Sequence, residues 1–301
     1  MVAVFPCHPQ PWDMFMNNSR QALMFVLPAL LLYGAFVAVP ILQVAAYSVF
    51  SWDNGSIKVF SGLANYQRLT SDGVFWTALG HNAIWAILTL CFPLLIGLVL
   101  ASILAERSPR TIRLMSALYF LPRTIPLVVA GIIWGWIYNP IFGLLNYVLD
   151  LIGLGSLGGA WLAESGSALL SLNAAGAWTF YGFCVLIYLS AIQSIDPSLY
   201  EAASLDGAGW GQRFRFITVP LLKSTTLFLG LYAAIEAMRF FDLVWVTTQG
   251  GPGYDTEVLT THIYKTFFLV GDFGYAAALS VVLLVIVLTI GGLSYRILRQ
   301  S

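Results

Sequence analysis

The chain has 301 residues and no net formal charge; 59% of its residues are hydrophobic and only 9% are charged. An average soluble domain carries about 25% charged residues. So little polar surface would not keep a globular protein of this size in solution, and a net charge of zero gives no general attraction for nucleic acid. The composition therefore predicts an integral membrane protein.

Six apolar runs follow a polar, proline-bearing stretch, residues 1–20, which we predict to be a cytoplasmic tail. Each run reaches the roughly 20 residues that a membrane-spanning helix needs. Pro28 and Pro40 predict kinks in the first run, which membrane helices tolerate. The predicted spans lie near residues 21–48, 77–105, 114–138, 168–192, 223–247 and 274–297. The expected fold is thus all-α, with a single six-span domain over residues 21–301.

Basic residues indicate the orientation of these spans. One side of the membrane receives nine of them and the other side receives three. The nine are Arg20, Arg107, Arg110, Arg113, Arg213, Arg215, Lys223, Arg296 and Arg299, and the three are Lys58, Arg68 and Lys265. Because cytoplasmic loops carry the excess of Lys and Arg, we expect both termini and the loop 193–222 to be cytoplasmic. The chain is thus predicted to cross a membrane several times.

The residues that most often bind metals show no ligand spacing. They are Cys7, Cys91, Cys184, His8, His81 and His262. We therefore predict neither a metal site nor a catalytic site. The sequence also lacks a phosphate-binding P-loop, so any ATP hydrolysis would have to occur on another chain.

The loop 194–222 is the most polar of the predicted cytoplasmic segments, and it has the clearest residues for beginning and ending helices. Asp196 can cap a helix that begins at the next residue. A group of glycines beginning at Gly207 then predicts a turn, and residues 211–218 predict a second helix that Pro220 ends. A plain connection would need only about 4–6 residues. We interpret this helix-turn-helix as a docking site for another protein.

The same loop carries a family resemblance. Glu201-Ala202-Ala203 is followed by Gly207, Ile217 and Val219-Pro220. Except for Val219 in place of leucine, the residues and spacing resemble the cytoplasmic signature of permeases from ATP-binding-cassette (ABC) importers. Residues 206–208, 121–140 and 241–253 resemble the binding-protein-dependent, carbohydrate-uptake branch (maltose, glycerol-phosphate and glucoside types). The chain is most similar to the first of two permeases in a heterodimer.

This resemblance implies the type I ABC importer permease fold, a non-catalytic subunit and a location in a bacterial plasma (inner) membrane. The implied partners are a sister permease, two copies of an ATPase subunit that bind ATP and Mg, an extracytoplasmic solute-binding protein, the lipid bilayer and a carbohydrate-like ligand. No cofactor is expected on this chain. The implied ATPase-coupling residues are Glu201, Ala202, Ala203, Asp206, Gly207 and Phe214, with Phe214 as an apolar knob.

Four ionisable residues, Arg123, Glu236, Arg239 and Asp242, lie within the third and fifth runs. The last three follow one another at i, i+3 spacing, so on a continuous helix they would share a face as an ion-paired ladder. Charged residues in a membrane usually pair with one another or face a cavity. Both interpretations stay open: a structural ion pair, or a polar wall for a hydroxyl-rich ligand.

The resemblance places the ligand cavity on the fourth and fifth spans. The implied substrate-binding residues are Gly176, Thr179, Phe180, Phe183, Ala233, Glu236, Ala237 and Phe240. A carboxylate beside aromatic rings suits a sugar, because the carboxylate accepts hydroxyl hydrogen bonds and rings stack on the apolar sugar face. Trp178 and Tyr181 have a different helical phase, and we expect them to pack.

The predicted function is the permease subunit of an ABC importer for a sugar, oligosaccharide, glycoside or related polyol. The alternative is a secondary transporter driven by an ion gradient. Such a transporter would use Glu236, Arg239 and Asp242 as a proton or sodium relay, but it leaves the loop 194–222 without a role. A membrane enzyme would need a cluster of His and carboxylates at a membrane face, which the sequence does not show.

Overall fold

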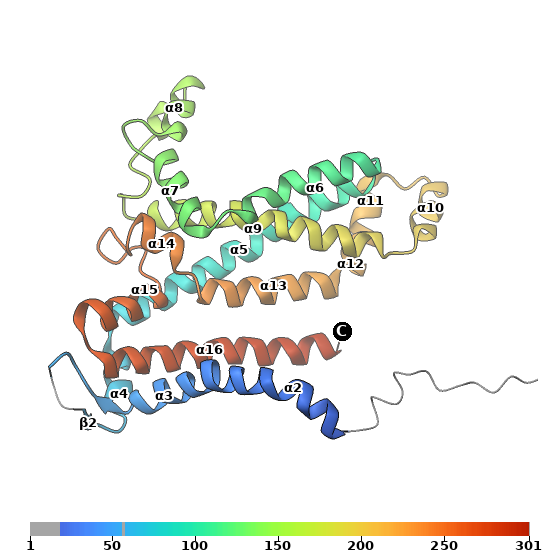
Figure 1. Ribbon diagram of the computed structural model, residues 1–301. Coiled ribbons are helices and arrows are strands. Elements are labelled where there is room, and N and C mark those ends of the chain that lie inside the picture. Colours follow the sequence, from blue (N-terminus) through green and yellow to red (C-terminus); the bar gives the residue numbers. More distant parts are fainter. Residues whose placement is uncertain (1–18, 56–57, 301) are drawn as a thin grey trace, which may run out of the picture.

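Long helices lying roughly side by side make up most of the molecule (Figure 1). The computed structural model describes residues 19–55 and 58–300, so the tail predicted over residues 1–20 lies almost wholly outside it. One end of the bundle carries short strands and small helices. The other end carries the segment that follows the fourth span and the C-terminal end of the chain (Figure 1).

The first span consists of α2 (Ser19–Tyr33), a π-helical turn η1 (Gly34–Ala38) and α3 (Val39–Tyr47). Of the two prolines predicted to kink it, Pro28 lies inside α2, and Pro40 follows η1. Pro40 has no N–H to donate, so it interrupts the α-helical hydrogen bonding of the preceding turn. The wider π turn η1 lies at this interruption. This span packs along α16 at the edge of the bundle (Figure 1).

A short hairpin and a small helix lead into the second span. Strand β1 (Phe50–Ser51) pairs antiparallel with β2 (Val59–Phe60), and α4 (Ala64–Ser71) follows. Buried Asn65 donates hydrogen bonds to the carbonyl oxygens of Ser48 and Phe50, both at 2.9 Å. This amide therefore fastens α4 to the end of the first span.

Helices α5 (Gly73–Ala105) and α9 (Ala168–Gln193) form the centre of the bundle, with α13 (Lys223–Met238) against α5. A Cβ at Gly97 would lie only 2.6 Å from the Cβ of Cys184. Small residues allow membrane helices to approach this closely. Around this crossing, Leu94, Tyr188 and Leu229 are buried in one apolar core.

The third span is broken, and the prediction of one continuous helix over residues 114–138 is wrong. Helix α6 (Pro109–Thr124) meets α7 (Leu127–Ile137) at 93°. The cause is Pro126, which disfavours a helical conformation at the preceding residue; Ile125 is extended, with φ −79° and ψ 127°. Helices α7 and α8 (Leu144–Leu151) project from the bundle, followed by a 3-10 turn, η2 (Gly155–Leu157) (Figure 1).

The loop after α9 contains α10 (Pro197–Leu205), α11 (Trp210–Arg213), a π-helical turn η3 (Phe214–Thr218) and α12 (Val219–Leu221). The helical run Trp210–Leu221 passes through Pro220 and bends by 67° into α13. The predicted second helix, residues 211–218, is thus too short at both ends. Pro220 does not end it, because the π turn already interrupts the α-helical bonding there.

The fifth span ends earlier than predicted. Helix α13 stops at Met238, and α14 (Asp242–Thr247) is a separate short helix. A single helix over residues 223–247 is therefore wrong. The chain continues through α15 (Leu259–Tyr264) and a π-helical turn η4 (Lys265–Val270) to α16 (Phe273–Gln300), the last span.

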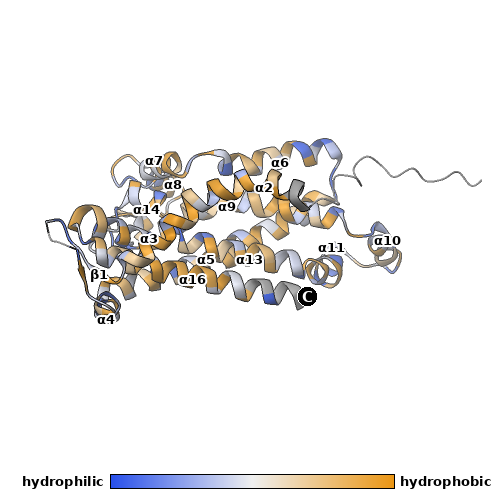
Figure 2. Ribbon diagram, turned by 60° about the horizontal axis from the view of Figure 1, so that its bottom comes forward, coloured by the Kyte–Doolittle hydropathy of each residue, from blue (hydrophilic) through white to orange (hydrophobic). Residues whose placement is uncertain are grey.

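Four helical segments of the described residues are long and apolar enough to cross a membrane, and two bent pairs raise the number to six if each counts as one span. The four are Leu23–Tyr47, Gly73–Ala105, Ala168–Gln193 and Phe273–Leu293. Hydrophobic residues cover the middle of the helices, whereas polar residues concentrate towards the ends (Figure 2). This distribution fits a bundle surrounded by lipid.

Candidate functional site: the coupling loop and the cavity between the broken spans

The loop 194–222 begins with a well-formed cap. The Asp196 carboxylate accepts a hydrogen bond of 2.9 Å from the Ser198 N–H at the start of α10. Hydrogen bonds from Ser198 lower the pKa of Asp196 below its ordinary value. Gly207 has φ +79°, a conformation that favours glycine, and so permits the turn that ends α10. The predicted cap and turn are both present.

Three contacts hold this loop in place, one to the bundle and two within the loop itself. The Arg213 guanidinium lies 3.0 Å from the Glu106 carboxylate at the end of α5, and it also donates to Ser204 Oγ at 3.2 Å. The hydroxyls of Tyr200 and Thr218 are 3.0 Å apart, which joins α10 to η3. The loop is therefore tied both to α5 and to itself.

The predicted coupling residues differ in their accessibility. Glu201, Ala202, Asp206 and Gly207 are exposed, and Ala203 is half-buried. Their positions suit a docking surface.

Phe214 does not have the geometry predicted for a knob. It stacks on Trp210, with ring centroids 5.2 Å apart, and packs against the apolar core between α5 and α9. Other apolar residues of the loop are more exposed than Phe214: Phe216 in η3 is 71% exposed, and Leu205 at the end of α10 is the most exposed, with 89% of its side chain accessible. Hydrophobicity alone does not distinguish Leu205 from Phe214, because both are large apolar residues within the loop.

A cavity of about 460 Å³ lies between the loop 194–222, called the coupling loop from here on, and the C-terminal ends of α5 and α9. Its lining includes Glu106, Tyr200, Glu201, Trp210, Arg213 and Phe214. Beside this cavity, the loop is attached to the bundle through its ion pair with Glu106, the packing of Phe214 and Leu222 in the apolar core, and its covalent connections to α9 and α13.

The predicted ligand wall does form one surface. Seven of the eight predicted residues line a single small cavity of about 30 Å³: Gly176, Thr179, Phe180, Ala233, Glu236, Ala237 and Phe240. The eighth, Phe183, stands beside it, with its ring centroid 5.8 Å from that of Phe180. Trp178 and Tyr181 line a separate cavity on α5 and α9, as their helical phase indicated.

Four further residues complete the cavity and were not assigned to it from the sequence. They are Trp85 and Thr89 on α5, Arg123 at the end of α6, and Leu127 at the start of α7. The Trp85 and Phe240 rings lie 4.0 Å apart between centroids. Arg123 had the clearest signal of a functional position, because it is a charged residue within an apolar run. Its pairing with Glu236 could not be predicted from the sequence.

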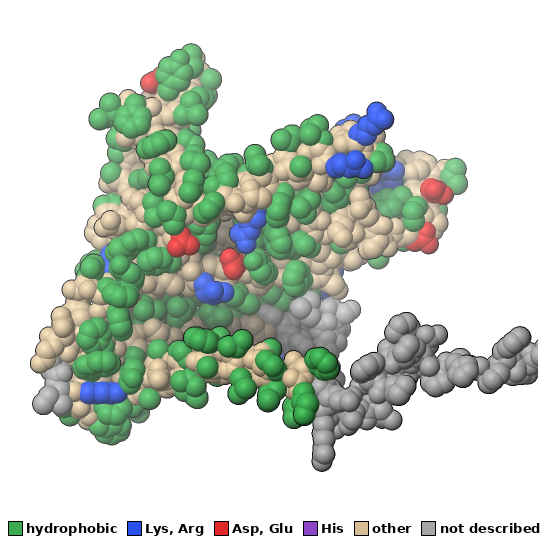
Figure 3. Space-filling model, viewed as in Figure 1, with side chains coloured by type: hydrophobic (Ala, Val, Ile, Leu, Met, Phe, Trp, Pro, Cys, Tyr) green, Lys and Arg blue, Asp and Glu red, His purple; other side chains and the backbone are tan. Residues whose placement is uncertain are grey.

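The predicted ion-paired ladder is wrong. Because α13 ends at Met238, the i, i+3 geometry that would join Glu236 to Arg239 and Asp242 is lost. No ion pair joins these three side chains, all of which the structure describes. Glu236 instead faces Arg123, with 4.0 Å between Oε2 and Nη2. Figure 3 shows acidic and basic side chains together in a hollow of an otherwise largely apolar face.

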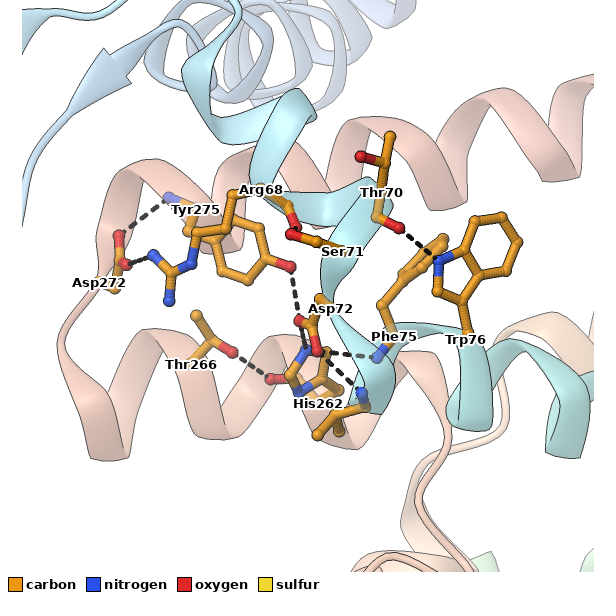
Figure 4. A network of polar contacts seen from close by, with 11 residues as sticks. Arg68, Thr70, Ser71, Asp72, Phe75, Trp76, His262, Thr266, Asp272 and Tyr275 are labelled. Carbon is orange, nitrogen blue, oxygen red and sulfur yellow. Dashed lines mark hydrogen bonds and ion pairs between the residues drawn. The ribbon is translucent and has the colours of Figure 1, made fainter.

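A polar network at the opposite end of the bundle from the coupling loop fixes the start of α5 (Figure 4). Asp72 caps α5 and accepts hydrogen bonds from Tyr275 OH at 2.5 Å and His262 Nε2 at 3.0 Å. Nearby, Arg68 and Asp272 form an ion pair. Burial raises the pKa of the Asp72 carboxyl, but hydrogen bonds from Tyr275, His262 and a backbone N–H lower it more, so the net shift is downward.

Buried polar groups also fix the end of α13. Asn82 on α5 is fully buried, donates to the Ala237 carbonyl at 2.6 Å, and accepts from the Leu259 N–H at 2.9 Å. In the loop beyond, the buried Glu257 carboxylate pairs with Lys265. The short α13 is therefore held at a defined position against α5 and α15.

A model of the family described as the inner membrane component of binding-protein-dependent transport systems matches residues 94–301. The chain belongs to this family. A probable ABC transporter permease of Bacillus subtilis, YurN, is 36% identical over 287 residues, which cover 95% of this chain and 98% of that protein. This permease is thus a non-catalytic transport subunit, and the alternative of an ion-driven secondary transporter is not supported.

Two further similarities concern proteins named for carbohydrates. The lactose transport system permease LacF of Rhizobium radiobacter is 34% identical, over 92% of this chain and 93% of that protein. A crystal structure of a bacterial ABC transporter involved in the import of the acidic polysaccharide alginate matches with a TM-score of 0.78. That match is 25% identical and covers 95% of this chain and 99% of the other. The type I importer permease fold is confirmed.

Proposed function

We propose that this permease carries a sugar, oligosaccharide, glycoside or related polyol into the cell. The observation that carries the proposal is the cavity at the broken spans, where Glu236 and Arg123 lie together with the rings of Trp85 and Phe240. Charged groups can hydrogen-bond to hydroxyls while aromatic rings cover the apolar face of a sugar. The carbohydrate names of the lactose permease and the alginate transporter support this substrate class.

The coupling loop serves, in this proposal, as the docking site for the ATPase subunits. Glu201, Ala202, Ala203, Asp206 and Gly207 form the contact surface, and Leu205 takes the place first given to Phe214. ATP and Mg bind to those partner subunits. The loop leads directly through α12 into α13, and α13 carries Glu236, so movement of the docked loop would reach the ligand cavity through one helix.

The complete transporter would contain this chain, a sister permease, two ATPase subunits and an extracytoplasmic solute-binding protein. The nine-to-three distribution of basic residues supports placing both termini and the coupling loop in the cytoplasm. In that orientation the network around Asp72 lies at the outer face, where the binding protein would deliver its ligand.

A reconstituted complex tests this function. The complex is placed in proteoliposomes, with the binding protein on one side and ATP on the other, and uptake of radiolabelled lactose, trehalose and maltose is measured. We expect uptake of at least one of these sugars, or of another glycoside from a wider panel, to require both ATP and the binding protein. Uptake of amino acids or peptides with no response to any sugar would contradict the substrate class.

A further inference from the structure

The ligand cavity lies where two broken spans face each other. Helix α6 ends at Thr124, one residue after Arg123, and α13 ends at Met238, two residues after Glu236. Residues of both breaks line the same cavity, Arg123 and Leu127 from one side and Glu236 and Phe240 from the other. Interrupted helices inside a membrane are tolerated where they line a cavity, and such breaks mark binding sites in transporters.

Arg123 and Glu236 neutralise each other but leave most of their hydrogen-bonding capacity unused. Their nearest nitrogen and oxygen are 4.0 Å apart, beyond the usual hydrogen-bond range. The guanidinium has five N–H donors, and its one hydrogen bond within the described chain goes to Tyr232 OH at 3.2 Å. Among the described residues, the Glu236 carboxylate has no hydrogen bond. The two side chains are 25% and 38% exposed.

We infer that Arg123 and Glu236 are a specificity-determining pair that binds an uncharged, hydroxyl-bearing sugar between them. This inference rests on the proposed function. The cavity of about 30 Å³ has no room for a sugar ring, so the ligand must separate the two side chains as it enters. Without ligand, the charges compensate each other. With ligand, the guanidinium donates to hydroxyl oxygens and the carboxylate accepts from hydroxyl groups.

The balance of charge makes the pair selective. A neutral sugar leaves the cavity with one positive and one negative group. An acidic sugar adds a second negative charge, and an uncompensated charge is costly in a low-dielectric site. The pair therefore selects against sugars that carry a carboxylate. The rings of Trp85 and Phe240 bind either kind of sugar equally, because they contact the apolar face of the ring.

The test compares equilibrium binding of a neutral and an acidic disaccharide to the complete complex in nanodiscs. The neutral probe is whichever of lactose, trehalose or maltose binds, and the acidic probe is a glucuronosyl-glucose disaccharide. Glu236→Gln leaves Arg123 unpaired. We therefore expect the ratio of the Kd of the neutral probe to the Kd of the acidic probe to rise about tenfold, the effect of one charge-assisted hydrogen bond to the acidic sugar. Arg123→Gln lowers this Kd ratio, and in the double variant the ratio returns to within about threefold of its value in the unmodified protein.

Arg239→Gln and Asp242→Asn are the matched controls, because both remove a charge next to the break in α13 without altering the cavity lining; we expect an unchanged ratio. If single variants fail to assemble, Arg123→Lys keeps the charge but loses the planar fork. It then weakens binding of the neutral probe about tenfold if Arg123 contacts the ligand.

An unchanged ratio in assembled Glu236→Gln and Arg123→Gln complexes, or unchanged affinity in Arg123→Lys, overturns the inference while leaving sugar transport intact. Binding of acidic sugars without any neutral sugar likewise overturns the inference, whereas binding of neither a neutral nor an acidic sugar overturns the proposed function itself.

Discussion

Arg213 in the coupling loop lies 3.0 Å from Glu106, which directly follows the C-terminal end of α5. This ion pair joins the loop to a helix that also lines the ligand cavity through Trp85 and Thr89. Beyond it, the described loop is joined to the bundle through aromatic packing and its covalent connections to α9 and α13. The pair is therefore a point at which movement of the loop and movement of the bundle are coupled.

Removing the pair should loosen this coupling. Arg213→Ala and Glu106→Ala should each destabilise the loop by about 0.5–1 kcal/mol, because both side chains are partly exposed to solvent. We expect ATP hydrolysis to lose part of its dependence on ligand, while the complex still assembles. The double variant should resemble Arg213→Ala, because loss of the guanidinium already breaks the ion pair with Glu106 and the hydrogen bond to Ser204. Fully additive effects, or unaltered ligand dependence, would show that the contact does not transmit movement.

Leu205 should be an anchor for the ATPase. Leu205→Asp places a charge on a side chain that is 89% exposed, so the free permease should insert and fold normally, but ATPase subunits should not co-purify. Leu157→Asp is the control, because Leu157 is 61% exposed and lies in η2, away from the coupling loop. Co-purification is measured after detergent extraction. Equal recovery of ATPase with both variants would exclude Leu205 from the docking surface.

Gly182 should be essential for packing of α9 against α6. A Cβ at Gly182 would collide with the backbone carbonyl of Tyr119, whereas a Cβ at Gly80 would contact nothing within 4 Å. We expect Gly182→Ala to lower the stability of the permease by at least the about 1–3 kcal/mol typical of overpacking. Gly80→Ala should have little effect. Thermal unfolding in detergent distinguishes them, and equal melting temperatures would mean that the two helices pack differently.

Asp72 should contribute a pH-dependent part of the stability. Its pKa lies below the ordinary value of 3.8, so its contribution is present above that value and is lost as the pH falls through the lowered pKa. Asp72→Asn can still cap α5, but it cannot accept from Tyr275 and His262 as a carboxylate does. We expect a loss of about 1 kcal/mol at pH 7 that shrinks in acid. A loss that stays constant down to pH 3 would be inconsistent with the lowered pKa.

The sequence was most informative where the local chemistry is specific. The capping residue Asp196 and the turn at Gly207 located the coupling loop, because each has a defined backbone role. Hydropathy located the apolar runs. It carries no information about the angle between successive helix segments, so the bend at Pro126 was not predicted although the sequence shows the proline. The end of α13 had no such signal, since residues 239–241 are Arg-Phe-Phe.

The lining of the ligand cavity was also only partly predictable from the sequence. The family resemblance placed the cavity on the fourth and fifth spans, and seven of the eight residues that it implied line one cavity. Trp85 and Arg123 belong to other helices, α5 and α6. Their position at the cavity depends on how these two helices cross α9. The pairing of Glu236 with Arg123 rather than Arg239 follows from that crossing and from the early end of α13.

The central claim is that ATP hydrolysis on partner subunits drives sugar transport through the loop around Glu201. The most direct measurement is binding-protein-dependent sugar uptake by proteoliposomes containing the complete complex, with and without Glu201→Lys. We predict ATP-dependent uptake that Glu201→Lys abolishes while this permease remains correctly inserted. Unchanged uptake in the variant, or uptake driven by a proton or sodium gradient in the absence of ATP, would contradict the claim.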